Sequence, residues 1–372
     1  MVYYLIYAVL LLLAFYEVYV FRRTAIKRES KGLERYSHKT WTNIRVILCL
    51  FTVFFIAFAG LRWEVGIDFY TYLNAYNNLI SGKTDNIEWT FKILSLIVPS
   101  LTFIFIFYAF FSVLLTVKVI KDNSQFIFLS LLLFFSNVFL RYDMGIMRQG
   151  LALAVTMWAL KYAIKRKFFK FIICIFIAVL FHRSAIIFIP AYFIVNIRFS
   201  NSAIIIITLV CMILGITDFW KYAVKIVAYL HLPGMDKYLG HLNNSNYINY
   251  SLRATDISML AFLFLFMFII DRKDAKIGKM NRALLNLYFT GVCIYYLFRP
   301  YTTLSDRGSY YYCIYEVLLL PLLLKYVDNK WLRAIVLLAV CLYSFNKVNF
   351  FVNYESTSFM NAPYVPYKLP WG

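Results

Sequence analysis

The sequence predicts an all-α fold, a polytopic bundle of membrane-spanning helices. Of its 372 residues, 62% are hydrophobic and only 15% are charged, whereas a soluble domain carries about 25% charged residues and cannot shield so much apolar surface from water. Runs such as 261–270 are apolar at every position, which favours lipid-embedded helices over the alternating strands of a membrane barrel. A soluble fold is therefore excluded, and the length has room for about ten to thirteen spans of roughly 20 residues.

Hydropathy and helix-breaking residues divide the chain into about 12 transmembrane helices. In chain order, the expected spans are 2–21, 44–61, 91–117, 124–140, 146–164, 168–182, 184–198, 201–217, 256–270, 283–298, 309–326 and 331–347. The first has no basic residue before it and no small-residue cleavage site after it, so we expect a retained helix rather than a signal peptide. The sixth and seventh are short and are candidates for a re-entrant hairpin around His182. We expect one polytopic membrane domain, 1–348, and a C-terminal tail, 349–372.

The net charge of +20 is distributed in a way that predicts membrane topology rather than a nucleic-acid partner. Lys and Arg residues gather in alternate connections between spans, and such residues are retained next to spans on the cytoplasmic side. The basic segments are 22–45, 118–121, 161–170, 272–282 and 325–333, together with Arg198. This bias places the N-terminus, the C-terminal tail and the loops at about 62–90 and 218–255 outside the cytoplasm.

The outer loop 218–255 begins with an amphipathic segment, 219–226. Lys221 and Lys225 are four residues apart and share one face of a helix, opposite apolar side chains. This pattern predicts a helix that lies in the membrane interface.

Five arginines lie at the outer ends of the spans, although basic residues next to spans are usually retained on the cytoplasmic side. They are Arg62, Arg141, Arg148, Arg183 and Arg307. An arginine kept beside a span on the outer side is a candidate for binding an anion at the membrane surface. The alternative for each is contact with a lipid phosphate or an ion pair with a nearby carboxylate.

Three further outer residues, Glu64, Asp68 and His182, are candidate general bases. Glu64 and Asp68 would share a face if their loop is helical, and the alternative for Glu64 is a loop ion pair with Arg62. The tyrosines Tyr70, Tyr72 and Tyr311 are candidates for stacking on sugar rings, although an aromatic belt at the membrane interface explains such tyrosines equally well.

Several motifs are absent from the sequence, and their absence narrows the chemistry. There is no phosphate-binding loop for a nucleotide, no DxD pair for a metal-held nucleotide sugar, no HExxH zinc helix and no GxSxG elbow. The six cysteines lie singly in apolar runs without metal-ligand spacing. We therefore expect no metal and no cofactor, and a donor that is already in the membrane. His231 and Asp236 have the spacing of some acyltransferases, but no companion motif supports that activity.

Three runs resemble the EpsG-like group of Wzy-type polysaccharide polymerases over about residues 60–190. They are the run from Arg62 to Tyr70, the run from Met147 to Ala154 and the run from Ala178 to Pro190; the run from Asp306 to Tyr310 is similar to a less fixed late motif. The resemblance implies a multi-pass protein of the bacterial cytoplasmic (inner) membrane. It also implies a glycosyltransferase that joins oligosaccharide repeat units carried on undecaprenyl diphosphate, on the outer leaflet. The product would be O-antigen, capsule or exopolysaccharide, and a flippase and a chain-length regulator would be partners.

This chemistry suits the outer arginines. Breaking the bond from the anomeric carbon to the diphosphate places negative charge on the leaving group, which the planar, permanently charged guanidinium stabilises. We expect Arg148, Arg62 and Arg307 to contact the diphosphate, while Glu64, Asp68 or His182 takes the proton of the acceptor hydroxyl. An O-antigen ligase and a polysaccharide flippase or transporter remain the alternatives.

Overall fold

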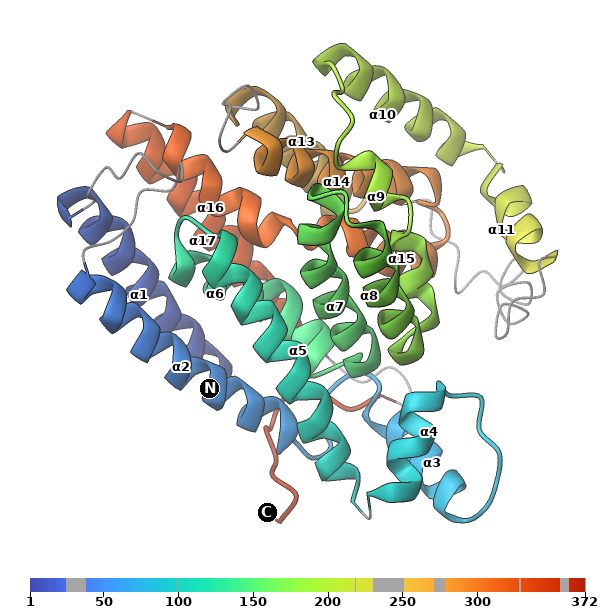
Figure 1. The fold of residues 1–372 in the computed structure, drawn as a ribbon. Helices are drawn as coiled ribbons and strands as arrows, with labels where there is room; N and C mark the ends of the chain where they lie inside the picture. The colour runs from blue at the N-terminus through green and yellow to red at the C-terminus, as the bar shows by residue number, and fades with distance from the viewer. Residues whose placement is uncertain are drawn as a thin grey trace. The chain divides into compact units, whose positions relative to one another are not determined.

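The computed structural model describes residues 1–24, 38–98, 100–217, 219–229, 251–270, 278–327, 329–354 and 361–371. Within these ranges every regular element is a helix, and β-structure is limited to two isolated bridges (Figure 1). The predicted all-α class is confirmed. The helices group into two compact units, which are described in turn.

The first unit contains residues 1–186 and 317–371 of the described part. Its helices are α1 (Val2–Thr24), α2 (His38–Gly60), α3 (Phe69–Ile80), α4 (Trp89–Ile97), α5 (Leu101–Asn123), α6 (Ile127–Leu133), the π-helix η1 (Phe134–Asp143), α7 (Met147–Ile164), α8 (Phe168–Phe181), α16 (Glu316–Tyr326) from its second residue onward, and α17 (Lys330–Val352). Helices α2, α5, α7 and α8 pack against one another in this order (Figure 1). Gly60 permits the approach of α2 to α5, because a Cβ at this position would lie 2.7 Å from Ile106 Cγ1.

A buried carboxylate on α1 fixes the start of α6. Glu17 is only 2% exposed, and its Oε1 accepts a hydrogen bond from the backbone N–H of Ile127 at 2.7 Å. Its Oε2 accepts from the N–H groups of Phe128 at 2.7 Å and Leu129 at 3.4 Å. These N–H groups have no partner within their own helix, and the positive end of the helix dipole favours a negative charge there. Glu17 therefore has a structural role.

The second unit contains residues 187–274 and 278–316, of which 218, 230–250 and 271–274 lie outside the described part. Its helices are α9 (Ala191–Ile194), α10 (Asn201–Ile216), α11 (Phe219–Tyr229), α13 (Ala254–Ile269), α14 (Gly278–Leu297) and α15 (Thr302–Cys313). Helix α14 packs against α9, α10, α13 and α15 and so forms the centre of the unit. The side-chain amide of Asn286 on α14 donates to the carbonyls of Ile194, at 2.8 Å, and Ile197, at 2.9 Å, which satisfies backbone groups left over where α9 ends.

The segment expected to lie in the membrane interface is helical, as α11. Phe219, Tyr222, Ile226 and Tyr229 follow each other at intervals of three or four residues along it, and all four are exposed. This apolar stripe is the pattern of an interfacial helix, whose place in the interface stays a prediction. His231 and Asp236, with their acyltransferase-like spacing, lie outside the described residues.

Three helices of the described part are long and apolar enough to cross a membrane: Trp41–Gly60, Leu101–Asn123 and Lys330–Val352. Five shorter apolar helices accompany them: Val2–Val18, Phe168–Phe181, Arg183–Ile194, Asn201–Ile216 and Ala254–Ile269. The apolar helical character of the chain is thus confirmed, and the total of about 12 spans stays a prediction.

Some predicted span boundaries were wrong. The span 91–117 is divided between α4 and α5, since Val98 is extended (φ −105°, ψ 117°), as residues that precede a proline usually are. The span 309–326 is divided between α15 and α16, and 184–198 consists of the 3₁₀-helix η2 (Arg183–Phe188) followed by the short α9. A hydropathy window averages over such short breaks and therefore does not register them.

We predict that Glu17→Ala lowers the free energy of unfolding by about 3 kcal/mol, because it leaves buried N–H groups without an acceptor. Glu17→Gln keeps one acceptor oxygen and should cost about 1 kcal/mol. Thermal unfolding of the purified protein in detergent measures both changes. The matched control is Asp122→Asn, an exposed carboxylate 3.9 Å from Lys118, and equal stability of the Glu17 and Asp122 variants would contradict the capping role.

Candidate functional site

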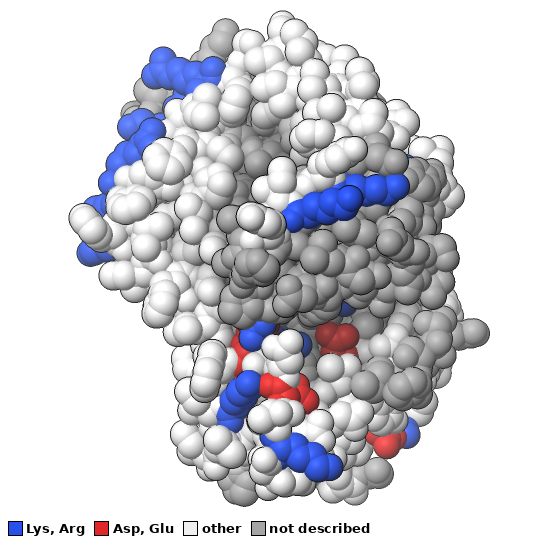
Figure 2. All heavy atoms as spheres, turned by 90° about the vertical axis from the view of Figure 1, so that its right-hand side faces the viewer, with Lys and Arg blue, Asp and Glu red and all other residues white. Residues whose placement is uncertain are grey.

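The candidate site lies in the first unit, where three residues at helix ends come together. Glu88 directly precedes α4, Arg148 lies in the first turn of α7, and His182 directly follows α8. Helix α4 packs against α3, α5 and α8, while α7 packs against α5 and α8. This packing brings the three side chains into contact although Glu88 is 60 residues from Arg148 and 94 from His182 in the chain. Figure 2 shows acidic and basic side chains together in the lower part of the face, the level of α3 and α4 in Figure 1.

The Glu88 carboxylate joins the other two side chains, and we call the three residues the Glu88 cluster. Its Oε2 accepts a charge-assisted hydrogen bond from Nη1 of Arg148, and its Oε1 lies 3.0 Å from Nδ1 of His182. The side chains are largely buried, with 9% of Glu88, 14% of Arg148 and 18% of His182 exposed. Such burial reduces screening by water, so the carboxylate holds both partners more firmly than a surface ion pair would.

Neighbouring side chains hold this arrangement in place. Thr90 Oγ1 in the first turn of α4 donates to the carbonyl of Leu180 near the end of α8 at 2.8 Å, which keeps Glu88 close to His182. The guanidinium carbon of Arg148 lies 5.3 Å from the centroid of the Tyr72 ring. Nε of Arg148 is buried and has no hydrogen-bond acceptor among the described residues. A buried N–H group without an acceptor is costly, and an oxygen of a bound anion would satisfy it.

Arg62 is fully buried next to the start of α7. Its Nη1 donates to the carbonyl of Ala59, its Nη2 lies 3.9 Å from Sδ of Met147, and its guanidinium carbon lies 4.3 Å from the centroid of the Phe105 ring. Burial lowers the pKa of Arg62 below its usual value, and the charge of Asp143 opposes this shift. Burial raises the pKa of Asp143 to about 7, although Ser112 and Arg62 both favour its charged form.

Glu64 and Asp68 do not share a helical face. The loop 61–68 is not helical, because α3 begins only at Phe69, and Glu64 has a left-handed backbone conformation (φ 51°). Glu64 forms an ion pair with Lys368 at 2.5 Å, and not with Arg62, the partner in the alternative considered from the sequence. Asp68 is the last residue before α3.

The other predicted site residues are distributed over both units. In the first unit, the guanidinium carbon of Arg141 lies 5.5 Å from the centroid of the Tyr142 ring, Arg183 begins η2, and Tyr70 lies on α3. In the second unit, Arg307 and Tyr311 lie on α15. Tyr72 and Tyr311 are fully buried in this conformation, whereas Tyr70 is half-buried. The roles predicted for these residues in binding diphosphate or sugar stay predictions.

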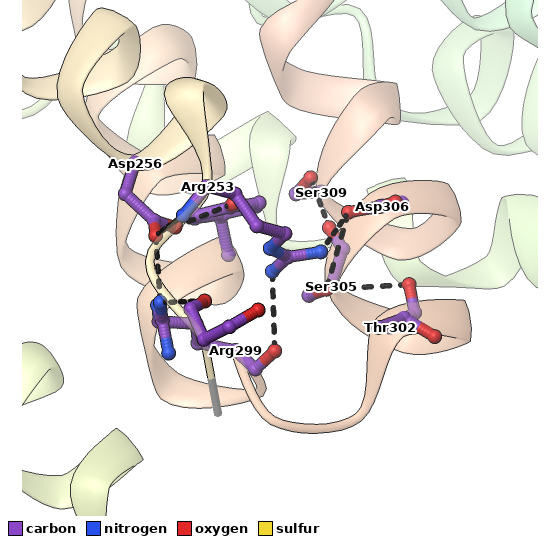
Figure 3. Close-up of polar contacts among 9 residues, drawn as sticks. Arg253, Asp256, Arg299, Thr302, Ser305, Asp306 and Ser309 are labelled. Atoms are coloured by element: carbon purple, nitrogen blue, oxygen red, sulfur yellow. Dashed lines mark hydrogen bonds and ion pairs between the residues drawn. The ribbon is translucent and has the colours of Figure 1, made fainter. Parts of the chain in front are cut away.

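A second polar group joins the start of α13 to α15 and to the connection between α14 and α15, within the second unit (Figure 3). Nη2 of Arg299 lies 2.7 Å from Oδ2 of Asp256, and Nη1 of Arg253 lies 3.2 Å from Oδ1 of Asp306. Tyr295 donates to Oδ1 of Asp256 at 2.7 Å. The hydrogen bond to Asp256 raises the pKa of Arg299. These contacts link α13 to the end of α14 and to α15 within the second unit.

Glu88 was not predicted from the sequence as a site residue. One signal was present, since it stands between Ile87 and Trp89 at the outer end of an expected span, the position that singled out the arginines. No residue near it in the sequence indicates its partners, because the Glu88 cluster forms only when α4, α7 and α8 pack together.

The family model of the EpsG family matches residues 45–369, which is nearly the whole chain. The match includes the Glu88 cluster and the loop 61–68. No curated protein and no solved structure matches the chain. With its apolar helices and this match over nearly its full length, the chain is an integral membrane protein that belongs to the EpsG family, a family of Wzy-like polysaccharide polymerases.

Proposed function

We propose that this protein polymerises oligosaccharide repeat units carried on undecaprenyl diphosphate, on the outer leaflet of the bacterial cytoplasmic membrane. The family supports a polysaccharide polymerase, and the Glu88 cluster is the observation that carries the proposal. It combines a largely buried arginine, which suits a diphosphate, with a carboxylate–histidine pair, which suits removal of a proton from a hydroxyl. A flippase that supplies the repeat unit and a chain-length regulator are the expected partners.

Arg148 has the role of stabilising the leaving diphosphate. The bond between the anomeric carbon of the donor sugar and the diphosphate oxygen breaks, and the electron pair stays on that oxygen. Arg148 lies in the first turn of α7, where the helix dipole adds positive potential, and its Nε has no acceptor within the described residues. The ion pair with Glu88 fixes the orientation of the guanidinium before substrate binds, so little reorganisation is needed as negative charge develops.

His182 has the role of accepting the proton of the acceptor hydroxyl. With Nδ1 held by the Glu88 carboxylate, the neutral imidazole donates to Glu88 from Nδ1 and takes the proton at Nε2. The hydroxyl oxygen then forms the new glycosidic bond, and the charged imidazole is stabilised by the same carboxylate. Glu64 is less suited to this role because Lys368 already pairs with it, and among the described residues no side chain holds Asp68 in a comparable arrangement.

The product formed in cells distinguishes a polymerase from an O-antigen ligase or a flippase. We expect a strain that lacks this protein to carry at most one repeat unit at each surface attachment point, because translocation and attachment still operate. Size analysis of the surface glycan and of the lipid-linked pool measures this. Loss of all surface glycan, with long chains kept on the carrier, would instead identify a ligase.

Arg148→Lys should remain substantially impaired, because it keeps the charge but loses the two-pronged geometry. Loss of one charge-assisted contact to the developing diphosphate should cost roughly 2 to 4 kcal/mol, which is about a hundred-fold or more in rate. The assay is polymer formation by purified protein in lipid from carrier-linked repeat units, with Arg166→Lys in the turn between α7 and α8 as the control.

The same assay tests whether arginine replaces a metal. We expect full activity in EDTA. Abolition by EDTA with rescue by magnesium or manganese would contradict the metal-free mechanism, and full activity of Arg148→Ala at equal protein would remove this residue from the site.

Glu88 and His182 should act as a pair. We expect His182→Ala to lower kcat by about a hundred-fold or more and Glu88→Gln to lower it less. Glu88→Gln should add little to His182→Ala, since residues that act as a unit are not additive. The matched control is Asp122→Asn, and fully additive effects of Glu88→Gln and His182→Ala on kcat would show that Glu88 does not act through His182.

A further inference from the structure

Residues 361–371 form a strap, which we call the C-terminal strap, against the loop 61–68. The backbones pair in antiparallel fashion, Trp63 with Lys368 and Gly66 with Ala362. The N–H of Trp63 donates to the carbonyl of Lys368 at 2.9 Å, and the N–H of Ala362 donates to the carbonyl of Gly66 at 3.3 Å. This part of the expected C-terminal tail therefore folds back onto the first unit.

Side chains fasten the strap to the helices around it. The ring of Tyr367 stacks on Phe58 at a centroid distance of 4.3 Å and its hydroxyl donates to the carbonyl of that residue at 2.9 Å. Tyr364 is fully buried and donates to the carbonyl of Leu140 at 2.7 Å, while its own carbonyl accepts from Tyr3 at 2.8 Å. The strap thus contacts α1, the end of α2 and the π-helix η1.

The loop that the strap holds is strained. Glu64 has a φ of 51°, a conformation that a residue with a side chain rarely adopts. Gly66 has a φ of 108°, which glycine adopts without strain. A Cβ at Gly66 would lie 2.1 Å from the carbonyl oxygen of Met144, so the loop presses directly on the turn before α7. Strained backbone persists only where the surroundings hold it, and the pairing with Lys368 holds it at Glu64.

The strap also reaches the turn that leads to the Glu88 cluster. A Cβ at Gly145 would lie 2.9 Å from the hydroxyl of Tyr364, which places that hydroxyl against the turn. Arg148 follows three residues later, and Arg62, at the start of the strapped loop, contacts Met147. The strap therefore contacts both the loop 61–68 and the turn before α7, at the point where these two segments meet.

We propose that the C-terminal strap is a positioning element of the polymerase site, which holds the loop 61–68 against the turn 143–147 and thereby sets the placement of Arg148. The effect on turnover rests on the proposed function. Because the strap pairs with a loop that the charge bias places outside the cytoplasm, the strap lies on the outer side and can be reached from there. It acts through the loop and the turn and touches no substrate.

The first test removes the strap and returns it from outside. In proteoliposomes with outward-facing protein, a chain ending at Met360 should show at least a tenfold loss of kcat, and a synthetic peptide of residues 361–372 added outside should restore a substantial part of it. A chain ending at Pro370 is the control, since it removes only Gly372 and the 72% exposed Trp371, and should keep normal activity. Normal kcat of the chain ending at Met360 would overturn the proposal.

The second test keeps the full chain and reverses one ion pair. Lys368→Glu and Glu64→Lys should each lower kcat about tenfold with an unchanged midpoint of thermal unfolding, and the double variant should recover most of the activity. If Glu64→Lys is inactive and the double variant does not recover kcat, the positioning role is contradicted. Glu64 would then belong to the chemistry.

A readout independent of activity separates this proposal from the proposed function. Hydrogen–deuterium exchange at residues 61–68 should rise in Lys368→Glu and return to the native level in the double variant. Unchanged exchange at residues 61–68 would overturn the positioning role of the strap, even if the protein polymerises glycan. If exchange rises as expected but the native protein forms no polymer, the proposed function is wrong, and the conclusion that the strap holds the loop 61–68 still stands.

Discussion

A charge inside an apolar protein is stable only where opposite charge or hydrogen-bond donors face it, and this constraint organises the described structure. Glu17 meets the N–H groups at the start of α6, Glu88 meets Arg148 and His182, and Asp256 meets Arg299. Each carboxylate joins segments that are far apart in the chain. The few acidic residues of an apolar protein thereby fix which helix ends lie together.

At Glu88 the same constraint produces the candidate site, because the carboxylate contacts two further titratable side chains. The carboxylate fixes the guanidinium of Arg148 and the ring of His182 relative to each other, because both bonds end on one rigid group. Groups held in this way need little rearrangement when a reaction moves charge, which is the condition for electrostatic catalysis. The helix ends α4, α7 and α8 supply the rigidity, and Thr90 adds a direct link between α4 and α8.

The loop 61–68 differs from the Glu88 cluster because its own conformation is unfavourable. Its backbone is strained at Glu64, and Arg62 is buried. The left-handed backbone of Glu64 and the buried guanidinium of Arg62 both raise the energy of this loop. The C-terminal strap, more than 290 residues later in the chain, offsets this cost with backbone pairing, the ion pair of Lys368 and the buried Tyr364. Local strain next to a candidate site is thus stabilised by a distant part of the sequence.

The sequence by itself determined the all-α class, the apolar helices, the family and two of the three residues of the Glu88 cluster, Arg148 and His182. Composition, hydropathy and short motifs carry this information because they depend on residues close together in the chain. Only the tertiary structure decided that Glu88 joins them, that Glu64 pairs with Lys368, and that residues 361–371 return to the loop 61–68. Pairs separated by 60 to 304 residues form only when the helices pack against one another. A hydropathy pattern shows which face of a helix is apolar, but it does not specify which distant side chain that helix will contact.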